Sequence, residues 1–242
     1  MNRLNDVGST SQGRKVLGVI GGMGPMATAL FYRMLVSETK AVRDQEHVHV
    51  IIDGNSTIPD RTWAIESQHM EVLCDSVKMS ARRLIRAGAE LLVMPCNTAH
   101  VVYKEVVKNL PVPFLNIVTE TRKELDLSGC TRPCLLATKG TLRSGLYQEA
   151  LSDMDVLLPS AEERCEVHTA IEYIKGARIE EARSILMRVV TALIAKGADG
   201  VVFGCTDIPV ALEGENISVP VFDTTRILAR ASVRECGAHL RI

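Results

Sequence analysis

Short apolar runs alternate along the chain with longer segments in which apolar residues recur at helical spacing. This alternation is typical of an α/β protein with a largely parallel sheet. In the first half, strands are predicted at residues 15–20, 47–53, 90–94 and 112–118, and helices at 26–36, 69–87 and 99–108. In the second half, RPCLLATKGTLRSGLYQEAL predicts a strand, a turn and a helix, and VLLP predicts a short strand. A long helical stretch at 161–196, interrupted near Gly176, precedes a strand in GADGVVFGCTDIP and a final strand and helix in VPVFDTTRILARASVRE.

An internal repeat relates the two halves. LIRAGAELLVMPCNT, residues 84–98, aligns with LIAKGADGVVFGCTD, residues 193–207, at a constant offset of 109 positions. VPFLN at 112–116 is echoed by VPVFD at 219–223, and a GG…FY segment near the N-terminus has a fainter echo at 139–147. The repeat predicts two similar α/β halves, each with one cysteine, Cys96 or Cys205, at the carboxyl end of an equivalent strand.

Composition and charge exclude several classes of protein. The 242 residues are enough for one large domain or two of about 110 residues, and 46% of them are apolar. The net charge of −1 gives no indication of a nucleic-acid partner, and no apolar run approaches the roughly 18 residues that span a bilayer. Residues 1–14 are polar and lack the apolar region of a secretory signal. We therefore expect a soluble, cytoplasmic protein with reduced thiols and no membrane partner.

The seven cysteines fall into two groups. None belongs to a C-x-x-C pair and no His-x3-5-His set accompanies them, so no metal site is expected. The thiols at 74, 130, 134, 165 and 236 are expected to be inert, buried small groups. Cys96 and Cys205 differ, because the repeat retains both at strand ends, where ligand sites form and helix N-termini lower thiol pKa values.

Two opposed thiols without a metal or a cofactor lysine suit racemisation of a carbon acid. One thiolate removes a proton from one face of the carbon while one thiol delivers a proton to the other face. The charge that spreads into the substrate carboxylate then needs hydrogen-bond donors, which Asn97, Thr98 and Thr206 can supply beside the cysteines. The alternative for these three side chains is capping of the helices that follow.

GGMGPMAT, Gly21–Thr28, has two interpretations. It weakly matches a dinucleotide fingerprint, but the acidic residue of the next strand, Asp53, comes 31 positions after Gly22 instead of about 20. Pro25 suits the first position of a helix, which predicts a tight strand-to-helix turn. We interpret the segment as an anion-binding turn for the substrate, with Gly24 part of it.

Three further polar residues have open roles. Arg61, in the loop NSTIPDRT, either binds a carboxylate in a bidentate manner or pairs with Asp60 on the surface. His100, one helical turn after Cys96, either assists the thiol or forms a hydrogen bond within the fold. Asp207 either tunes Cys205, whose pKa a carboxylate would raise, or lies at a helix N-terminus where the dipole favours it.

GGMGPMAT, IPDRT, PCNTAH and GCTD, in this order, resemble the motifs of the cofactor-independent aspartate/glutamate racemase family. The similarity runs from Lys15 to the final helix. It implies two pseudo-symmetric Rossmann-like domains with mostly parallel four-stranded sheets and an active site at their interface. The expected division is a flexible extension at 1–14, one α/β domain at 15–117 plus 225–242, and the other at 118–224.

The resemblance also implies roles for individual residues. PLP-independent racemisation would use no cofactor, with Cys205 deprotonating the L-enantiomer and Cys96 the D-enantiomer. Met23, Asn97, Thr98 and Thr206 match positions that hold the substrate near its α-carboxylate, and Arg61 matches the arginine that meets the side-chain carboxylate of aspartate. Relatives are commonly dimers, so a homodimer is expected.

The chain departs from the family pattern at two positions. Asp207 stands where many members have a glutamate, one methylene longer. In aspartate racemases, a lysine in the helix after a VPSxEE-like stretch helps to bind the distal carboxylate. An ungapped placement puts Glu166 there, with no lysine until Lys175. Glu166 would repel a second carboxylate, which argues against an acidic substrate.

Aspartate is nevertheless the first substrate predicted and glutamate the second. The alternative within the same scaffold is an isomerase or decarboxylase of small dicarboxylic acids, for which one cysteine can suffice. A ligand-binding protein without activity is the third alternative, and the intact pair of cysteines argues against it.

Overall fold

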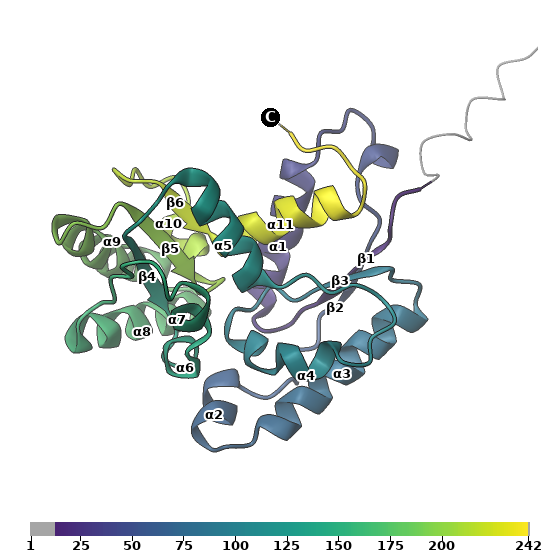
Figure 1. Ribbon diagram of the computed structural model, residues 1–242, viewed down its shortest axis with the longest axis horizontal. Coiled ribbons are helices and arrows are strands. Elements are labelled where there is room, and N and C mark those ends of the chain that lie inside the picture. Colours follow the sequence, from purple (N-terminus) through teal and green to yellow (C-terminus); the bar gives the residue numbers. More distant parts are fainter. Residues whose placement is uncertain (1–12, 242) are drawn as a thin grey trace, which may run out of the picture.

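The computed structural model describes residues 13–241, which form two parallel β-sheets enclosed by helices (Figure 1). Nearly all of the expected extension, residues 1–12, lies outside the described residues. The strands are β1 (Leu17–Ile20), β2 (Val50–Asp53), β3 (Leu91–Val93), β4 (Pro133–Ala137), β5 (Gly200–Gly204) and β6 (Val221–Asp223). The α-helices are α1 (Pro25–Glu38), α2 (Arg61–Glu66), α3 (Met70–Arg86), α4 (Tyr103–Val107), α5 (Ile117–Ser128), α6 (Lys139–Ser144), α7 (Leu146–Ala150), α8 (Ala161–Lys175), α9 (Ile179–Ala195), α10 (Ile208–Leu212) and α11 (Thr224–Glu235). Two 3-10 helices, η1 (Asp44–Glu46) and η2 (Thr98–Val102), complete the chain.

Each sheet has three strands, not the predicted four. Their orders are β2–β1–β3 and β4–β5–β6, with every pairing parallel. In each half the fourth segment forms a single parallel bridge, between Phe114 and Leu92 or between Leu157 and Cys134. Pro113 limits the pairing of the Phe114 segment, because it has no N–H to donate. It contributes only its carbonyl, which accepts from the Leu92 N–H. The fold class is as predicted, and only the strand number was wrong.

Both sheets reverse their strand order at the same place. From β1 the chain moves to β2 on one side and then to β3 on the other; from β4 it moves to the Leu157 segment on one side and then to β5 on the other. In parallel sheets a ligand crevice opens beyond the carboxyl ends of strands at such a reversal. The first sheet therefore points to the ends of β1 and β3, and the second to the ends of β4 and β5.

Alternating side chains of each strand enter two different cores. In β1, Leu17 and Val19 pack with the cluster that also contains Phe31 of α1 and Leu228 of α11, whereas Ile20 packs toward α2, α3 and α4. The second sheet also contributes one face to the first cluster and packs its other face against α8, α9 and α10. Helices α1, α5 and α11 thus form a layer shared by both sheets, as the central position of α11 and α5 in Figure 1 shows. The limits of the two domains stay a prediction.

Several local predictions are confirmed and one is refined. Pro25 begins α1, and the predicted interruption near Gly176 separates α8 from α9. The predicted helix at 99–108 is instead a 3-10 helix followed by the short α4. In the glycine turn, Gly22 has φ +87°, and a Cβ there would lie 2.3 Å from the carbonyl carbon of Asn55. Only glycine fits this position without displacing the loop after β2.

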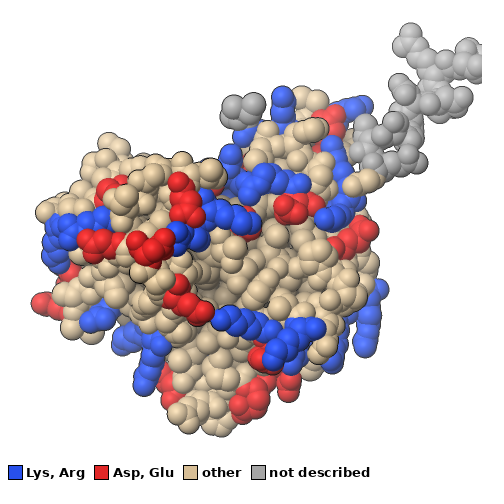
Figure 2. Space-filling model, in the orientation of Figure 1, with Lys and Arg blue, Asp and Glu red and all other residues tan. Residues whose placement is uncertain are grey.

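The surface carries charges of both signs. On the face seen in Figure 2, cationic and anionic side chains are interspersed around a largely uncharged central area. Among residues 13–241, no helix is both long and apolar enough to cross a membrane.

Candidate active site

A small pocket lies where the carboxyl ends of strands from both sheets meet. It has a volume of about 360 Å³, part of which is open to solvent. The residues around it come from the ends of β1, β3, β4 and β5, from α2 and from the end of α8: Met23, Asp60, Arg61, Thr62, Cys96, Asn97, Thr98, Thr138, Lys175, Cys205, Thr206 and Asp207. The site therefore forms at the strand-order reversals of the two sheets.

The two thiols enter this pocket from equivalent strands of different sheets. Cys96 follows β3 and Cys205 follows β5, and each residue is 5% exposed. The two β-strands are related by the internal repeat, so the thiols approach one cavity from its two halves. Proton transfer at both faces of one carbon needs an acid or base on each side, and the pocket has one thiol from each half.

The environment of Cys205 raises the pKa of its thiol well above the usual value. Burial is the main cause, and the negative charge of Asp207, whose carboxylate oxygen lies 3.8 Å from Sγ, adds to it. Lys175 acts in the opposite direction but more weakly. The backbone N–H of Asp207, at the start of α10, lowers this pKa as expected of a helix N-terminus, but burial and the Asp207 charge outweigh it.

Asp207 has a raised pKa of its own. Burial is again the main cause, and the positive charges of Lys175 and Arg61 partly offset it. The buried carboxylate and the buried thiol thus share Lys175 as a neighbouring cation, and Arg61 acts on Asp207 as well. Lys175 favours the ionised form of both groups, against the larger effect of burial.

His100 holds the Cys96 segment and does not line the pocket. Its Nδ1 lies 2.8 Å from the carbonyl oxygen of Cys96, and the Ile117 N–H donates to Nε2 at 3.2 Å. Burial lowers the pKa of His100 to about 4, so the ring is neutral and carries its proton on Nδ1. Of the two roles left open for His100, the structure favours the hydrogen bond within the fold.

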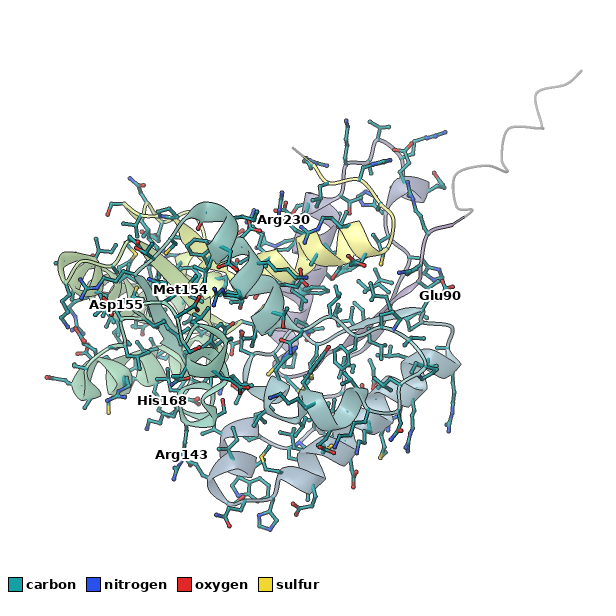
Figure 3. All side chains as sticks on the ribbon, in the orientation of Figure 1. Glu90, Arg143, Met154, Asp155, His168 and Arg230 are labelled. Atoms are coloured by element: carbon teal, nitrogen blue, oxygen red, sulfur yellow. The ribbon has the colours of Figure 1, made fainter. Side chains whose placement is uncertain are left out.

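Hydroxyl groups join the two halves at one side of the pocket. Thr98 Oγ1 lies 2.9 Å from Thr138 Oγ1 and 2.8 Å from Thr141 Oγ1. Thr138, at the end of β4, also caps α6 by accepting from the Thr141 N–H. Close by, α6 packs on α2, and Arg143 of α6, labelled in Figure 3, pairs with Glu66 of α2 at 3.6 Å.

Two cationic side chains line the pocket, and they differ in their hydrogen-bond and ion-pair partners. Arg61, the first residue of α2, donates to the Pro59 carbonyl at 3.3 Å and has no ion-pair partner among the described residues. Lys175, the last residue of α8, pairs with Glu172 at 2.8 Å. The alternative role of Arg61, a surface ion pair with Asp60, is not formed among the described residues; Asp60 instead caps α2 by accepting from the Trp63 N–H.

Glu166 does not approach the pocket. It forms two hydrogen bonds with Arg188 of α9, at 2.8 and 2.9 Å, and this ion pair directs its carboxylate away from the cavity. Glu166 is therefore not a lining residue of the pocket, and its placement at the family's lysine position stays a prediction. Lys175 lines the pocket, and it lies about two and a half turns further along α8, on the opposite side of the helix from Glu166.

Comparison with known proteins agrees with this geometry. The model of the Asp/Glu/Hydantoin racemase family matches residues 20–232. The chain belongs to this family. A curated relative, the broad specificity amino-acid racemase RacX of Bacillus subtilis, is 27% identical over 226 residues, covering 90% of this chain and 96% of that protein.

Solved structures of the racemase family show the same fold. Picrophilus torridus aspartate racemase has a TM-score of 0.85 and 32% identity, with 94% of this chain and 96% of that chain covered. An aspartate racemase homologue from Pyrococcus horikoshii OT3 has a TM-score of 0.76 and 26% identity, with 92% and 99% covered. The chain is therefore an isomerase of the amino-acid racemase type with the two-sheet architecture of this family.

The racemase pocket contains most of the predicted site residues and several that were missed. The predicted residues around it are Met23, Arg61, Asn97, Thr98, Thr206 and Asp207 with both cysteines. Gly24 is not among them, although a Cβ there would lie 3.9 Å from Asp207 Oδ1. The missed residues are Asp60, Thr62, Thr138 and Lys175. The repeat could have indicated Thr138, since it pairs the segment after β4 with the glycine turn after β1.

Proposed function

We propose that this racemase acts on a small amino acid through Cys96 and Cys205, which exchange the roles of base and acid at the α-carbon. The observation that carries the proposal is that both thiols line one small pocket from opposite halves of the molecule. A thiolate on one side takes the α-proton, and the S–H on the other side supplies a proton to the opposite face. No PLP enters this scheme.

The donors beside the thiols suit an α-carboxylate. Asn97, Thr98 and Thr206 line the same pocket, close to the sulfur atoms in sequence. Negative charge spreads into the α-carboxylate as the α-proton leaves, so hydrogen bonds to its oxygens are stronger in the transition state than in the bound substrate. We assign these residues and Met23 to substrate binding.

We further propose aspartate as the preferred substrate and glutamate as the next. Arg61, which forms no ion pair among residues 13–241, offers its guanidinium to a second carboxylate, and Lys175 lies in the same pocket. The repulsion that Glu166 was expected to cause is removed by its ion pair with Arg188.

A panel of amino acids of both hands, incubated in D2O without PLP, tests the function. Racemisation by the two thiols places deuterium at the α-carbon of the inverted product, with aspartate turned over fastest. Absence of both inversion and α-deuteration with all common amino acids would remove the proposal. A second outcome, conversion of a small dicarboxylic acid without α-exchange of an amino acid, would indicate the isomerase or decarboxylase alternative.

Single cysteine variants test the assigned roles. Cys96→Ala and Cys205→Ala should each abolish inversion, because one face of the carbon then lacks its acid or base. Cys96→Ala should still exchange the α-proton of the L-enantiomer, and Cys205→Ala that of the D-enantiomer. Cys74→Ala, which removes a buried thiol of α3 outside the pocket, is the matched control and should retain activity. Full activity in either pocket variant would contradict the assignment of Cys96 and Cys205 as a catalytic pair.

The homodimer and the cytoplasmic location of the protein stay predictions.

A further inference from the structure

A chain of buried hydrogen bonds connects the segments that carry the two thiols. The Tyr147 hydroxyl donates to Asn97 Oδ1 at 2.6 Å, and Asn97 Nδ2 donates to Thr224 Oγ1 at 2.9 Å. The Thr224 hydroxyl in turn donates to the carbonyl oxygen of Phe203 at 2.8 Å. All four residues are 4% exposed or less. We call these four residues the Tyr147 chain.

The Tyr147 chain has a single consistent direction. The carbonyl of Phe203 can only accept, so the Thr224 hydroxyl must donate to it and accept from the amide of Asn97. The oxygen of that amide then faces Tyr147, whose hydroxyl donates. Every link is satisfied in water-excluded surroundings, where an unmade hydrogen bond is costly and the geometry is correspondingly fixed.

Two members of the Tyr147 chain, Asn97 and Phe203, lie close to the two cysteines in sequence. Asn97 directly follows Cys96 at the end of β3, and Phe203 is in β5, two residues before Cys205. Thr224 opens α11, the helix of the layer shared by both sheets. The Tyr147 chain therefore connects one sheet to the other through side chains. It also uses one of the two amide protons of Asn97, and this fixes the direction of the second amide proton.

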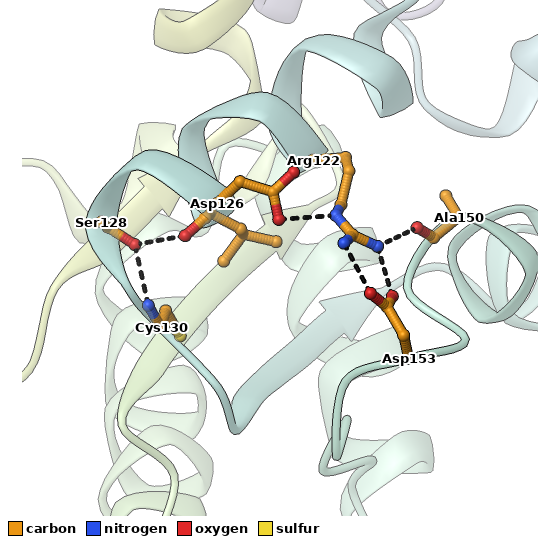
Figure 4. A network of polar contacts seen from close by, with 7 residues as sticks. Arg122, Asp126, Ser128, Cys130, Ala150 and Asp153 are labelled. Carbon is orange, nitrogen blue, oxygen red and sulfur yellow. Dashed lines mark hydrogen bonds and ion pairs between the residues drawn. The ribbon is translucent and has the colours of Figure 1, made fainter.

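Tyr147 itself is held in place by a separate network. It lies on α7, whose last residue, Ala150, accepts a hydrogen bond from Arg122 of α5 at 2.9 Å. Figure 4 shows the Arg122 guanidinium between Asp126 of its own helix and Asp153 beyond α7. These contacts of Arg122 anchor the end of α7, the helix that carries Tyr147, and so support the hydrogen bond of the Tyr147 hydroxyl to the Asn97 amide.

We propose that Tyr147 and Thr224 are positioning residues that set the separation of the Cys96 and Cys205 thiols for inversion. The proposal rests on the proposed two-thiol racemisation. In that reaction, the Cα–H bond breaks as one S–H bond forms, and the S–H bond of the other cysteine breaks as a new Cα–H bond forms on the opposite face. Abstraction needs one thiol in place, whereas inversion needs both at once.

Tyr147→Phe and Thr224→Val each break a different link of the chain. The measurement compares deuterium in the recovered starting enantiomer with deuterium in the inverted product, at low conversion in D2O. If the second thiol is misplaced, the thiol that removed the α-proton, after its hydrogen has exchanged with D2O, returns deuterium to the same face of the carbanion. Exchange without inversion then increases relative to inversion. We expect this ratio to rise about tenfold in both variants, since a misplacement of about 1 Å can cost roughly a hundredfold in rate.

Matched variants separate positioning from general damage. Tyr103→Phe removes a hydroxyl that donates to the Phe114 carbonyl at 2.6 Å, and Thr39→Val removes one that donates to the Leu35 carbonyl at 2.7 Å. Both lie outside the Tyr147 chain and should leave the ratio unchanged. Thr224→Ser keeps the hydroxyl and should restore the wild-type ratio.

Each outcome decides between the proposals. A wild-type protein that inverts no amino acid removes the proposed function itself. A wild-type protein that inverts its substrate, with variants that lose exchange and inversion in equal proportion or lose neither, overturns the positioning role. If one variant fails to fold, the other decides, because the two act on different links, and Thr224→Ser against Thr224→Val gives the comparison within one site.

Discussion

Gly140 allows α6 to approach α2 beside the pocket, and replacing it with alanine tests how closely that contact controls the site. A Cβ at this position would lie 2.7 Å from Thr62 Oγ1, 2.8 Å from Thr98 Cγ2 and 3.1 Å from Thr62 Cα. Ordinary van der Waals contacts of a Cβ begin near 3.4 Å. The two helices must therefore separate by several tenths of an ångström in Gly140→Ala.

Two energetic effects oppose each other in this variant. Alanine favours a helical position over glycine by about 1 kcal/mol, partly by restricting the unfolded chain. Inserting a methyl group into a filled space costs about 1–3 kcal/mol. One of the close atoms is the backbone Cα of Thr62, which no rotamer change can move, so the steric cost should exceed the helical gain. We expect the free energy of unfolding to fall by up to about 2 kcal/mol, the steric cost less the helical gain.

The Gly140→Ala substitution should also lower the catalytic efficiency, kcat/KM, because the displaced helices carry residues of the pocket. Thr62 and Thr98 both line the pocket, and their displacement moves α2 and the Thr98 hydroxyl cluster away from the substrate. Since a shift of about 1 Å can cost roughly a hundredfold, several tenths of an ångström should lower kcat/KM about tenfold.

Urea unfolding and racemisation rates measure the two effects. Gly54→Ala is the control, because no atom lies within 4 Å of a Cβ at that position. Adding Thr98→Ser to Gly140→Ala removes the Cγ2 atom that the new methyl meets and keeps the hydroxyl, so part of the activity should return. The reasoning is refuted if Gly140→Ala matches Gly54→Ala in both stability and kcat/KM.

Three further predictions concern charge. In Asp207→Asn the pKa of Cys205 should fall, because a neighbouring negative charge raises it, so the bell-shaped pH profile of kcat/KM should move to lower pH. The shift must be the same from either enantiomer, since the equilibrium constant of racemisation is one; an unmoved profile would contradict the assigned effect. In Lys175→Gln the KM for aspartate should rise about tenfold or more relative to the KM for alanine, which has no second carboxylate, whereas the loss of the lysine charge beside Cys205 affects turnover of both substrates alike; equal effects on both KM values would argue against a side-chain contact. Because the pKa of His100 is about 4 in the folded protein and about 6.5 when unfolded, the unfolded state binds the extra proton between these values. Stability should therefore fall by up to about 3 kcal/mol as pH is lowered from about 6.5 to about 4, and urea midpoints of His100→Gln should fall less steeply; an equally steep fall would refute this.

Local pattern alone predicted the elements and the two thiol positions. The alternation of apolar runs and helical periods follows from the repeat of side-chain direction along strands and helices, so β1, α1 and β3 were found within a few residues. The internal repeat placed Cys96 and Cys205 at equivalent strand ends, and Pro25 correctly began α1. The strands, helices and Pro25 depend on neighbours within a few positions, whereas the repeat compares segments 109 positions apart, which the sequence alone also shows.

Only the tertiary structure decided the features that depend on distant residues. Whether the Phe114 and Leu157 segments extend a sheet depends on the partner strand as well as on their own sequence, and each forms only one bridge. Lys175 reaches the pocket and Glu166 does not, because the packing of α8 on α9 determines which turn of α8 faces the cavity. The sequence indicated that the Asp207 carboxylate would raise the pKa of Cys205, but the larger cause is burial, which depends on the packing of distant segments.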